Sequence, residues 1–520
     1  MQSIERGSKL IMCCSLTLCT LLFVLWSWRW PLVGDAALMH YTAFLADHGM
    51  VPYRDLLEMN APGAWVPDWL VMHTLGRGAL AWRVYDLLLG LTGIAAMAGI
   101  MRRGERMAGA IAGALFLLVH AQDGIAEAGQ RDLTAAVLCL LGGALLVHAL
   151  RTPAERSKRL VRIAIAFMPV AAALCVKPSL AAFVPAFLLV TCLGGRCEGT
   201  PSRDKGWQRL IAGLAGTALP IVATCLSLRR WHVAGIFLTL ILDLMRFHAG
   251  LGHRSFGYLA AHSFSPVILL LPGWVILCVT QRRRTQLRQG TTERLLLFAG
   301  AIAGWLAYAI QMKGLPYHRY AFLGFWLPLV VLDSMRALGQ TGYRRALGIL
   351  GLALCSLVLA PRFLWKAMHF NWHNQGTVSV LERDLTDLGM PLNGNVQCID
   401  TASGCLNALY NLAAVQRTGF LYDELIFGDG REPAVRKARE WLWGRLLDNP
   451  PPVIVVTDDW FLEGPVGYAK LQQWPEFADL LRERYQLKLE RKDLPDVQWW
   501  SRRQRAAGYR IYIYKPMPET

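Results

Sequence analysis

The chain has 520 residues, of which 54% are hydrophobic and only 18% are charged. This composition is too apolar for a water-soluble protein of this length and indicates an integral membrane protein. The formal net charge of +17 would suit a nucleic-acid-binding protein, but the basic residues lie in short clusters between long apolar segments, which argues against that class.

The first apolar segment, residues 10–28, follows Arg6 and Lys9 and is long enough to cross a membrane. A signal peptide would end in small residues at a cleavage site, whereas this segment ends in WSWRWP. We therefore expect an uncleaved first membrane helix.

Basic clusters recur between the later apolar segments and predict cytoplasmic loops, because Lys and Arg accumulate on the cytoplasmic side of membrane proteins. The clusters are Arg102, Arg103 and Arg106; Arg151, Arg156, Lys158, Arg159 and Arg162; Arg203, Lys205 and Arg209; Arg282, Arg283, Arg284 and Arg288; and Arg336, Arg344 and Arg345. Between successive clusters the chain must cross the membrane twice.

The spans that satisfy this condition are residues 10–28, 82–101, 107–121, 133–150, 163–176, 179–195, 210–228, 264–280, 295–311, 318–332 and 346–361. They predict an all-α polytopic membrane bundle of about eleven helices. The bundle would comprise residues 1–361, with the N-terminus in the cytoplasm and the tail on the outer side.

The first outer loop, residues 29–81, is long and contains elements of its own. Helical spacing of apolar residues predicts a helix over residues 36–45, with Asp35 at the N-cap position, and YRDLLEMN predicts a short amphipathic turn. Residues 62–76 are apolar but short and are broken by Pro and Asp, so we expect an interfacial helix there.

The remaining outer loops hold most of the unusual polar residues. These are Asp123, Glu127, Arg131 and Asp132; Lys177; Asp243, Arg246, His248, His253 and Arg254; and Lys313, Tyr317, His318, Arg319 and Tyr320. Charges at the edge of the hydrocarbon layer are costly unless they are paired or line a wet cavity. Their convergence on one side of one bundle favours a functional site.

Each of these residues also has a purely structural interpretation. Asp35 would then cap a helix, Lys177 would extend its ammonium to the membrane surface, and the histidines would pack in the core. Arg131 would pair with Glu127, one helical turn away. Arg54 and Glu58 are also four residues apart, and as an exposed pair they would contribute only a few tenths of a kcal/mol.

An outward-facing basic cavity suits group transfer from an anionic lipid. Four cations are candidates to hold a phosphate or diphosphate and to stabilise it as a leaving group: Arg131, Lys177, Arg246 and Arg319. A separate carboxylate such as Asp35 would remove the proton of an acceptor hydroxyl as it attacks.

The order of these features resembles the GT-C fold membrane glycosyltransferases, which include protein O-mannosyltransferases, lipid A aminoarabinose transferases and dolichyl-phosphate-mannose-mannosyltransferase-like proteins. The matching segments are GDAALMHYTAFLADHGMVPYRDLLEMNAPG, AGQRDLTAAVL, CVKPSLAAFVP and QMKGLPYHRYAFL. The resemblance covers about residues 34–332 as a pattern of order and spacing. It implies a polyprenyl-phosphate-linked sugar as donor and an acceptor that approaches from the periplasm. The pairing of a basic pocket with a separate carboxylate suits sugar transfer with inversion, and a glycan, a lipid and a protein are all open as acceptors.

The resemblance also implies roles for particular residues. Asp35 matches the family's catalytic base, and Asp132 matches a second acidic residue, with Asp123 or Glu127 as substitutes. The remaining candidates would bind the acceptor or the donor sugar: Arg54, Asp55, Glu58, Asp123, Glu127, Tyr317 and His318.

A bound divalent metal has only two candidate ligands, Asp35 and Asp132. Many relatives carry two adjacent acidic residues at the first position, whereas Asp35 is followed here by Ala36. The sequence shows no His or carboxylate cluster with clear ligand spacing, so the metal stays an open alternative.

The tail, residues 362–520, alternates strand and helix patterns and predicts a soluble α/β domain in the periplasm. It lacks a glycine pattern for phosphate binding, so we assign it no nucleotide site. Four tryptophans would stack on sugars or pack in the core: Trp460, Trp474, Trp499 and Trp500. Cys398 and Cys405 are candidates for a local disulfide in an oxidising compartment.

Two other classes compete with a bacterial inner-membrane glycosyltransferase. A transporter or flippase for a lipid-linked saccharide would also gather basic residues near lipid headgroups, but it would more often show internal repeats and charges at the bilayer midplane. An assembly protein would work through its tail, yet the polar residues lie in loops far from the tail in sequence.

Overall fold

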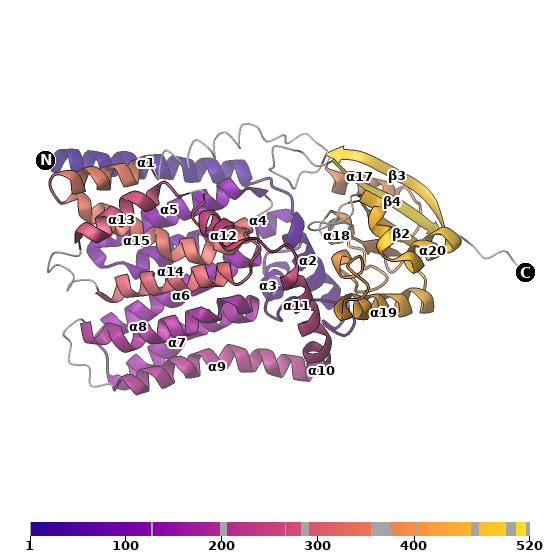
Figure 1. Cartoon of the computed structure of the whole chain (residues 1–520), viewed down its shortest axis with the longest axis horizontal. Helices are drawn as coiled ribbons and strands as arrows, with labels where there is room; N and C mark the ends of the chain where they lie inside the picture. The colour runs from indigo at the N-terminus through magenta and orange to yellow at the C-terminus, as the bar shows by residue number, and fades with distance from the viewer. Residues whose placement is uncertain are drawn as a thin grey trace, which may run out of the picture.

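The computed structural model describes residues 2–125, 128–197, 205–265, 267–281, 291–354, 376–401, 403–458, 467–495 and 506–515. It consists of a helical bundle and a smaller part with a β-sheet, and the two parts lie end to end (Figure 1).

Ten long helices of the bundle coincide in order with the first ten expected spans. They are α1 (Gln2–Ser27), α4 (Ala79–Ile100), α5 (Arg106–Asp123), α6 (Arg131–Arg151), α7 (Arg156–Val176), α8 (Phe183–Cys197), α9 (Gly206–Arg230), α13 (Leu270–Gln281), α14 (Thr291–Ala309) and α15 (Tyr320–Leu338). Residues 343–354 are also helical, and the rest of the last expected span lies outside the described residues.

The chain is a multi-pass membrane protein. Five described helical stretches are long and apolar enough to cross a bilayer: Ala79–Ile100, Arg131–Arg151, Arg156–Val176, Gly206–Arg230 and Pro316–Leu338. The last of them is 89% buried and lies at the centre of the bundle, whereas the α9 stretch is only 17% buried, as expected of a helix facing lipid. The number of about eleven crossings stays a prediction.

Short elements connect the long helices. They are α2 (Gly34–Asp47), α3 (Val66–Thr74), η1 (Arg103–Glu105), η3 (Pro178–Ala182), α10 (Ala234–Ile236), the π-helical turn η4 (Phe237–Ile241), α11 (Leu242–Gly250), α12 (Phe256–Ser263) and η6 (Pro316–Arg319). The nine-residue α3 falls within the segment expected to be an interfacial helix and is too short to cross a bilayer.

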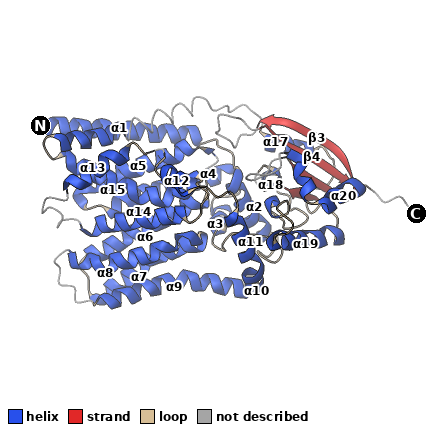
Figure 2. Cartoon of the chain, viewed as in Figure 1, coloured by secondary structure: helices blue, strands red, loops and turns tan. Residues whose placement is uncertain are grey.

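The C-terminal part contains a four-stranded mixed sheet with helices packed around it (Figure 2). Its elements are α17 (Thr377–Thr386), β1 (Val396–Ile399), α18 (Cys405–Asn411), η7 (Asp423–Leu425), α19 (Pro433–Asp448), β2 (Val453–Thr457), η8 (Gly467–Gln473), α20 (Pro475–Arg484), β3 (Tyr485–Pro495) and β4 (Ala506–Tyr514). The strand order is β1-β2-β4-β3, with β1 parallel to β2 and the other pairs antiparallel. All residues of β1 and β2 are buried, as expected of central apolar runs.

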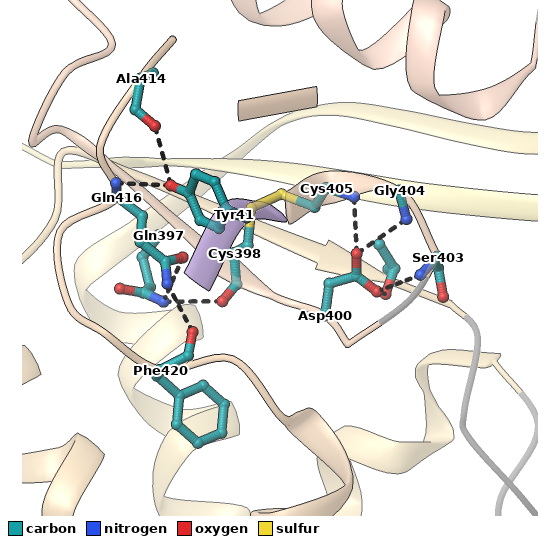
Figure 3. Close-up of a disulfide and its surroundings, with 11 residues drawn as sticks. Tyr41, Gln397, Cys398, Asp400, Ser403, Gly404, Cys405, Ala414, Gln416 and Phe420 are labelled. Atoms are coloured by element: carbon teal, nitrogen blue, oxygen red, sulfur yellow. Dashed lines mark hydrogen bonds between the residues drawn. A yellow bond between two sulfur atoms is a disulfide. The ribbon is translucent and has the colours of Figure 1, made fainter. Parts of the chain in front are cut away.

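The expected disulfide between Cys398 and Cys405 is present and ties the end of β1 to the start of α18 (Figure 3). The two Cα atoms are 5.8 Å apart. The Asp400 carboxylate lies inside this loop and accepts backbone N–H bonds from Ser403, Gly404 and Cys405 at 2.7–3.1 Å. These bonds satisfy backbone donors at the start of α18.

The tail packs directly on the first outer loop. The Tyr41 hydroxyl of α2 donates to the Ala414 carbonyl at 3.0 Å and accepts from the Gln416 N–H at 2.9 Å. Leu57 N–H donates to the Gly419 carbonyl at 2.9 Å, and a Cβ on Gly419 would lie 2.0 Å from the Asp55 carbonyl oxygen. The two chain segments can approach this closely only because residue 419 is glycine.

Candidate functional site

A cavity of about 260 Å³ lies where the helix ends of the bundle, the first outer loop and the tail meet. Its polar lining residues come from all three parts of the chain. They are Asp35, Asn60, Arg131, Lys177, Ser179, His248, Gln311, Lys313, Tyr317, His318, Thr401, Tyr422 and Glu424.

Asp35 is the second residue of α2 and is the carboxylate of the first outer loop that lines the cavity. The capping interpretation was wrong: the N-cap residue is Val33, and no side chain caps the helix. Within the described part of the chain, the Asp35 carboxylate accepts no hydrogen bond. It interacts electrostatically with three cations, Arg131, Lys177 and Lys313.

Lys177 occupies the turn between α7 and η3. Lys177 is 9% exposed and its ammonium pairs with one oxygen of Asp132, so it does not reach out to the membrane surface. The other Asp132 oxygen is buried and has no hydrogen-bond partner among the described residues. Burial lowers the pKa of Lys177 to about 8.

Arg131 begins α6 and points to the cavity from the end of a membrane-spanning helix. Among the described residues no carboxylate lies within ion-pair distance of its guanidinium, which contacts the Met39 sulfur at 3.9 Å. Glu127, the pairing partner considered from helical spacing, lies outside the described residues. The guanidinium is therefore available to an anionic ligand.

Lys313 adds a third cation to the lining, from the loop between α14 and η6. Burial lowers its pKa to about 8. Burial also lowers the pKa of His248, which favours the neutral form of this imidazole. The cavity thus combines three cations with two carboxylates, Asp35 and Glu424, and with neutral hydrogen-bonding groups.

Glu58 is a structural residue behind the cavity wall. Its carboxylate is buried and accepts bonds from the Tyr422 hydroxyl at 2.6 Å, from the Asn60 backbone and amide at 2.7 and 2.6 Å, and from the Thr42 hydroxyl at 3.1 Å. Glu58 therefore fixes Asn60 and Tyr422, which both line the cavity. Burial, and secondarily the Glu58 charge, raises the pKa of Tyr422 well above its ordinary value.

The interpretation of Arg54 and Glu58 as an exposed helical pair was wrong. Residues 51–60 form turns and bridges rather than a helix, and Arg54 pairs with Asp55 at 2.8 Å on the surface. Neither Arg54 nor Asp55 lines the cavity.

Two further predicted cations lie outside the cavity lining. The Arg319 guanidinium donates to both oxygens of Asp123 at 2.6 and 2.9 Å. The Arg246 side chain is 79% exposed and lies 3.6 Å from Asp243. The structure thus brings together Asp35, Arg131 and Lys177 with Tyr317 and His318, and it places Asp132 behind Lys177.

The tail contributes lining residues that the sequence pattern did not reveal. The Glu424 carboxylate accepts a bond from the Thr401 hydroxyl at 2.5 Å and lies 3.6 Å from His248 of α11. Thr401 belongs to the disulfide loop, which places it at the cavity. Of the four tryptophans, Trp474 is buried and stacks on Phe477, and the other three lie outside the described residues.

No three His, Cys, Asp or Glu side chains are grouped to hold a metal ion in the described ranges. Of the two candidate ligands, Asp132 is engaged by the Lys177 ammonium rather than turned to Asp35. The donor set at the cavity therefore does not fit a divalent metal.

No family model matches the chain, and no curated protein matches it. Solved structures do. The chain is similar to ArnT from Cupriavidus metallidurans in the apo state, with a TM-score of 0.57, 14% identity and coverage of 96% of this chain and 97% of that one. ArnT bound to undecaprenyl phosphate gives a TM-score of 0.55, 12% identity and the same coverage. The archaeal oligosaccharyltransferase AglB from Archaeoglobus fulgidus gives 0.46 and 11% identity, over 86% of this chain and 69% of that one.

The similarity to ArnT extends over nearly the full length and shows that the chain has the fold of ArnT, in agreement with the fold expected from the sequence. It is a likeness of fold. The function of the cavity has to be argued from its own residues.

Proposed function

We propose that the chain is a membrane glycosyltransferase that transfers a sugar from a polyprenyl-phosphate donor to an acceptor hydroxyl. One observation carries this proposal: a carboxylate that accepts no hydrogen bond from the described residues shares a cavity with three cations at the ends of membrane helices. The fold supports it, because the similar ArnT structure holds undecaprenyl phosphate.

The three cations would hold the donor phosphate. Arg131 presents a planar fork of N–H donors that matches a phosphate, and Lys177 and Lys313 add two positive charges within the same cavity. As the bond between the anomeric carbon and the phosphate oxygen breaks, negative charge grows on the leaving phosphate. Fixed cations stabilise this charge more strongly in the transition state than in the ground state.

Asp35 would act as the general base. It accepts the proton of the acceptor hydroxyl while the hydroxyl oxygen forms a bond to the anomeric carbon from the face opposite the phosphate. The products are the glycosylated acceptor, with inverted configuration, and the polyprenyl phosphate. Asp132 would support this step indirectly by holding the Lys177 ammonium in the cavity.

The acceptor and the sugar would bind beside the tail. Thr401, Tyr422 and Glu424 line that side of the cavity and offer hydroxyl and carboxylate groups that suit sugar hydroxyls. Tyr317 and His318 line the bundle side. We place this cavity on the periplasmic side of a bacterial inner membrane, with the N-terminus in the cytoplasm, because the basic loops lie at the other end of the helices.

The proposal is tested by transfer of radiolabelled sugar from purified polyprenyl-phosphate donors to membrane extract. We expect Arg131→Ala to lose donor binding and transfer, because it removes the planar cation of the cavity, which has no carboxylate within ion-pair distance among the described residues. Arg246→Ala is the matched control, since this arginine is exposed and lies outside the cavity. If the wild type transfers sugar from none of the donors, and Arg131→Ala binds the lipid as well as Arg246→Ala does, the result would favour transport of a lipid-linked saccharide instead.

A further inference from the structure

A second cavity, of about 400 Å³, lies at the opposite end of the bundle from the first. Its lining residues are Gly99, Met101, Arg102, Arg103, Arg106, His148, Arg151 and Thr152. Arg131 and Arg151 are the two ends of α6, a 21-residue helix. The two cavities are therefore separated by about 30 Å, the thickness of the hydrocarbon layer.

The helices that form this cavity pack closely because glycine lies at their contact. A Cβ on Gly109 of α5 would lie 2.4 Å from the Met97 carbonyl oxygen of α4. A Cβ on Gly99 of α4 would be 3.5 Å from the Ala144 Cβ of α6. This close approach gathers arginines from the end of α4, the start of α5 and the end of α6 around one space.

Two of the arginines are held in place by one buried carboxylate. Arg102 Nε donates to Glu293 Oε1 at 2.5 Å, and Arg151 Nη2 lies 2.6 Å from the same oxygen. Arg151 Nη1 also donates to the Met101 carbonyl at 3.1 Å. Glu293 is fully buried on α14, so these contacts anchor the two arginines on a buried charge.

The other two arginines have no such partner. Arg103 and Arg106 are exposed, and their side chains make no ion pair or hydrogen bond to any residue in the described part of the chain. The neighbouring Glu105 is engaged by Arg336 at 2.7 and 3.1 Å. Four arginines facing one glutamate leave a charge of +3 at the cavity.

We propose that this cavity binds the phosphate group of an anionic phospholipid. Arginine forks match phosphate oxygens, and basic pockets between membrane helices on the cytoplasmic side are sites for lipid headgroups. The cavity lies at the ends of two membrane-spanning helices, Ala79–Ile100 and Arg131–Arg151, which is the depth of the headgroups. Met107, beside Arg106, is 50% exposed and offers an apolar surface to an acyl chain.

This site stands apart from the proposed transfer reaction, so its test does not depend on activity. The full-length protein in neutral detergent is titrated with short-chain phosphatidylglycerol, with phosphatidylcholine of the same chain length and with inorganic phosphate. Binding is followed by the shift in thermal unfolding temperature and by native mass spectrometry. We expect phosphatidylglycerol to bind and to raise the unfolding temperature, and phosphatidylcholine to do neither.

The variant Arg103→Gln/Arg106→Gln should weaken phosphatidylglycerol binding about tenfold or more, because it removes two charge-assisted contacts. Arg156→Gln is the matched control, an exposed arginine at the same end of the bundle that does not line the cavity. If inorganic phosphate raises the unfolding temperature of the wild type but not that of the double variant, the cavity is a phosphate site whose ligand is soluble. Equal binding by the wild type and the double variant, or no binding by the wild type, would overturn the proposal.

Discussion

Lys177 and Asp132 form the ion pair on which the cavity most depends. Both side chains are buried, and one Asp132 oxygen already lacks a partner among the described residues. Removing one member of a buried pair leaves an uncompensated charge, which typically costs about 3–5 kcal/mol.

Replacing Lys177 with Met should therefore lower the thermal unfolding temperature and abolish transfer. The double variant Lys177→Met/Asp132→Asn should recover most of the stability, because neither charge of the pair is left without its partner. It should not recover transfer, because the phosphate has lost a cation. Calorimetry and the sugar-transfer assay measure the two effects separately. Recovery of transfer in the double variant would contradict the role of Lys177 in donor binding.

The pH dependence of donor binding should follow the protonation of Lys177 and Lys313. The pKa values of Lys177 and Lys313 are both lowered to about 8 by burial, so their positive charges are present at pH 7 and are lost as the pH rises through 8. The KM for the donor should rise above pH 8, and Lys313→Arg should extend the active range to higher pH because guanidinium stays charged. A donor KM that is flat to about pH 9.5 would show that neither lysine binds the phosphate.

At the scale of elements, the disulfide loop joins β1 to α18 and holds Thr401 at the cavity. Closing a loop with a sequence separation of 7 stabilises a fold by about 2–3 kcal/mol in the chain-entropy account. Asp400 adds bonds to three backbone N–H groups within the same loop.

The variant Cys398→Ser/Cys405→Ser should therefore lower the unfolding temperature and reduce transfer, and a reductant should do the same to the wild type. Cys14→Ser is a suitable control, because Cys14 is an exposed free cysteine in α1. A wild type whose unfolding temperature does not respond to reductant would show that the disulfide adds no stability.

The membrane helices were the most predictable elements. Their apolar length and the basic clusters between them give strong local signals, and ten expected spans coincide with helices. Asp35, Arg131 and Lys177 were also predictable as cavity residues, because each lies at the outer end of such a span or in the first loop. Helix α19 was missed, although its buried residues Val435, Ala438, Leu442 and Leu446 recur every three or four residues, as a helix requires.

Pairwise contacts were not predictable from one sequence. Arg319 looked like a phosphate ligand, yet the structure pairs it with Asp123, 196 residues away. Tyr422 and Glu424 escaped notice because they reach the cavity only through docking of the tail, and the Tyr422 bond to Glu58 spans 364 residues. No local pattern encodes such long-range pairing.

At the scale of the whole molecule, the tail forms a wall of the cavity through Thr401, Tyr422 and Glu424. It packs on the first outer loop through Tyr41, Leu57 and Gly419. The boundary expected after residue 361 lies outside the described residues and stays a prediction. The outer loops are far from the tail in sequence, which argued against a functional role of the tail. In the folded chain the two lie side by side and line the same cavity.

Gly419→Ala should weaken this docking, because its Cβ would collide with the Asp55 carbonyl at 2.0 Å. We expect lower transfer activity and faster proteolysis at the junction of tail and loop. Gly444→Ala on α19 is the matched control, since a Cβ there meets nothing within 4 Å. Normal transfer by Gly419→Ala would mean that the tail is not needed to complete the cavity.

The central claim is that Asp35 takes the proton of the acceptor while the cations hold the donor, and Asp35→Asn separates these roles. The dissociation constant of the donor and the rate of transfer are measured on the same purified protein. Asp47→Asn, on the same helix, is the control. The account predicts that Asp35→Asn binds the polyprenyl-phosphate sugar as tightly as the wild type and transfers it at least about a hundredfold more slowly. An Asp35→Asn variant that transfers at the rate of the wild type would contradict it.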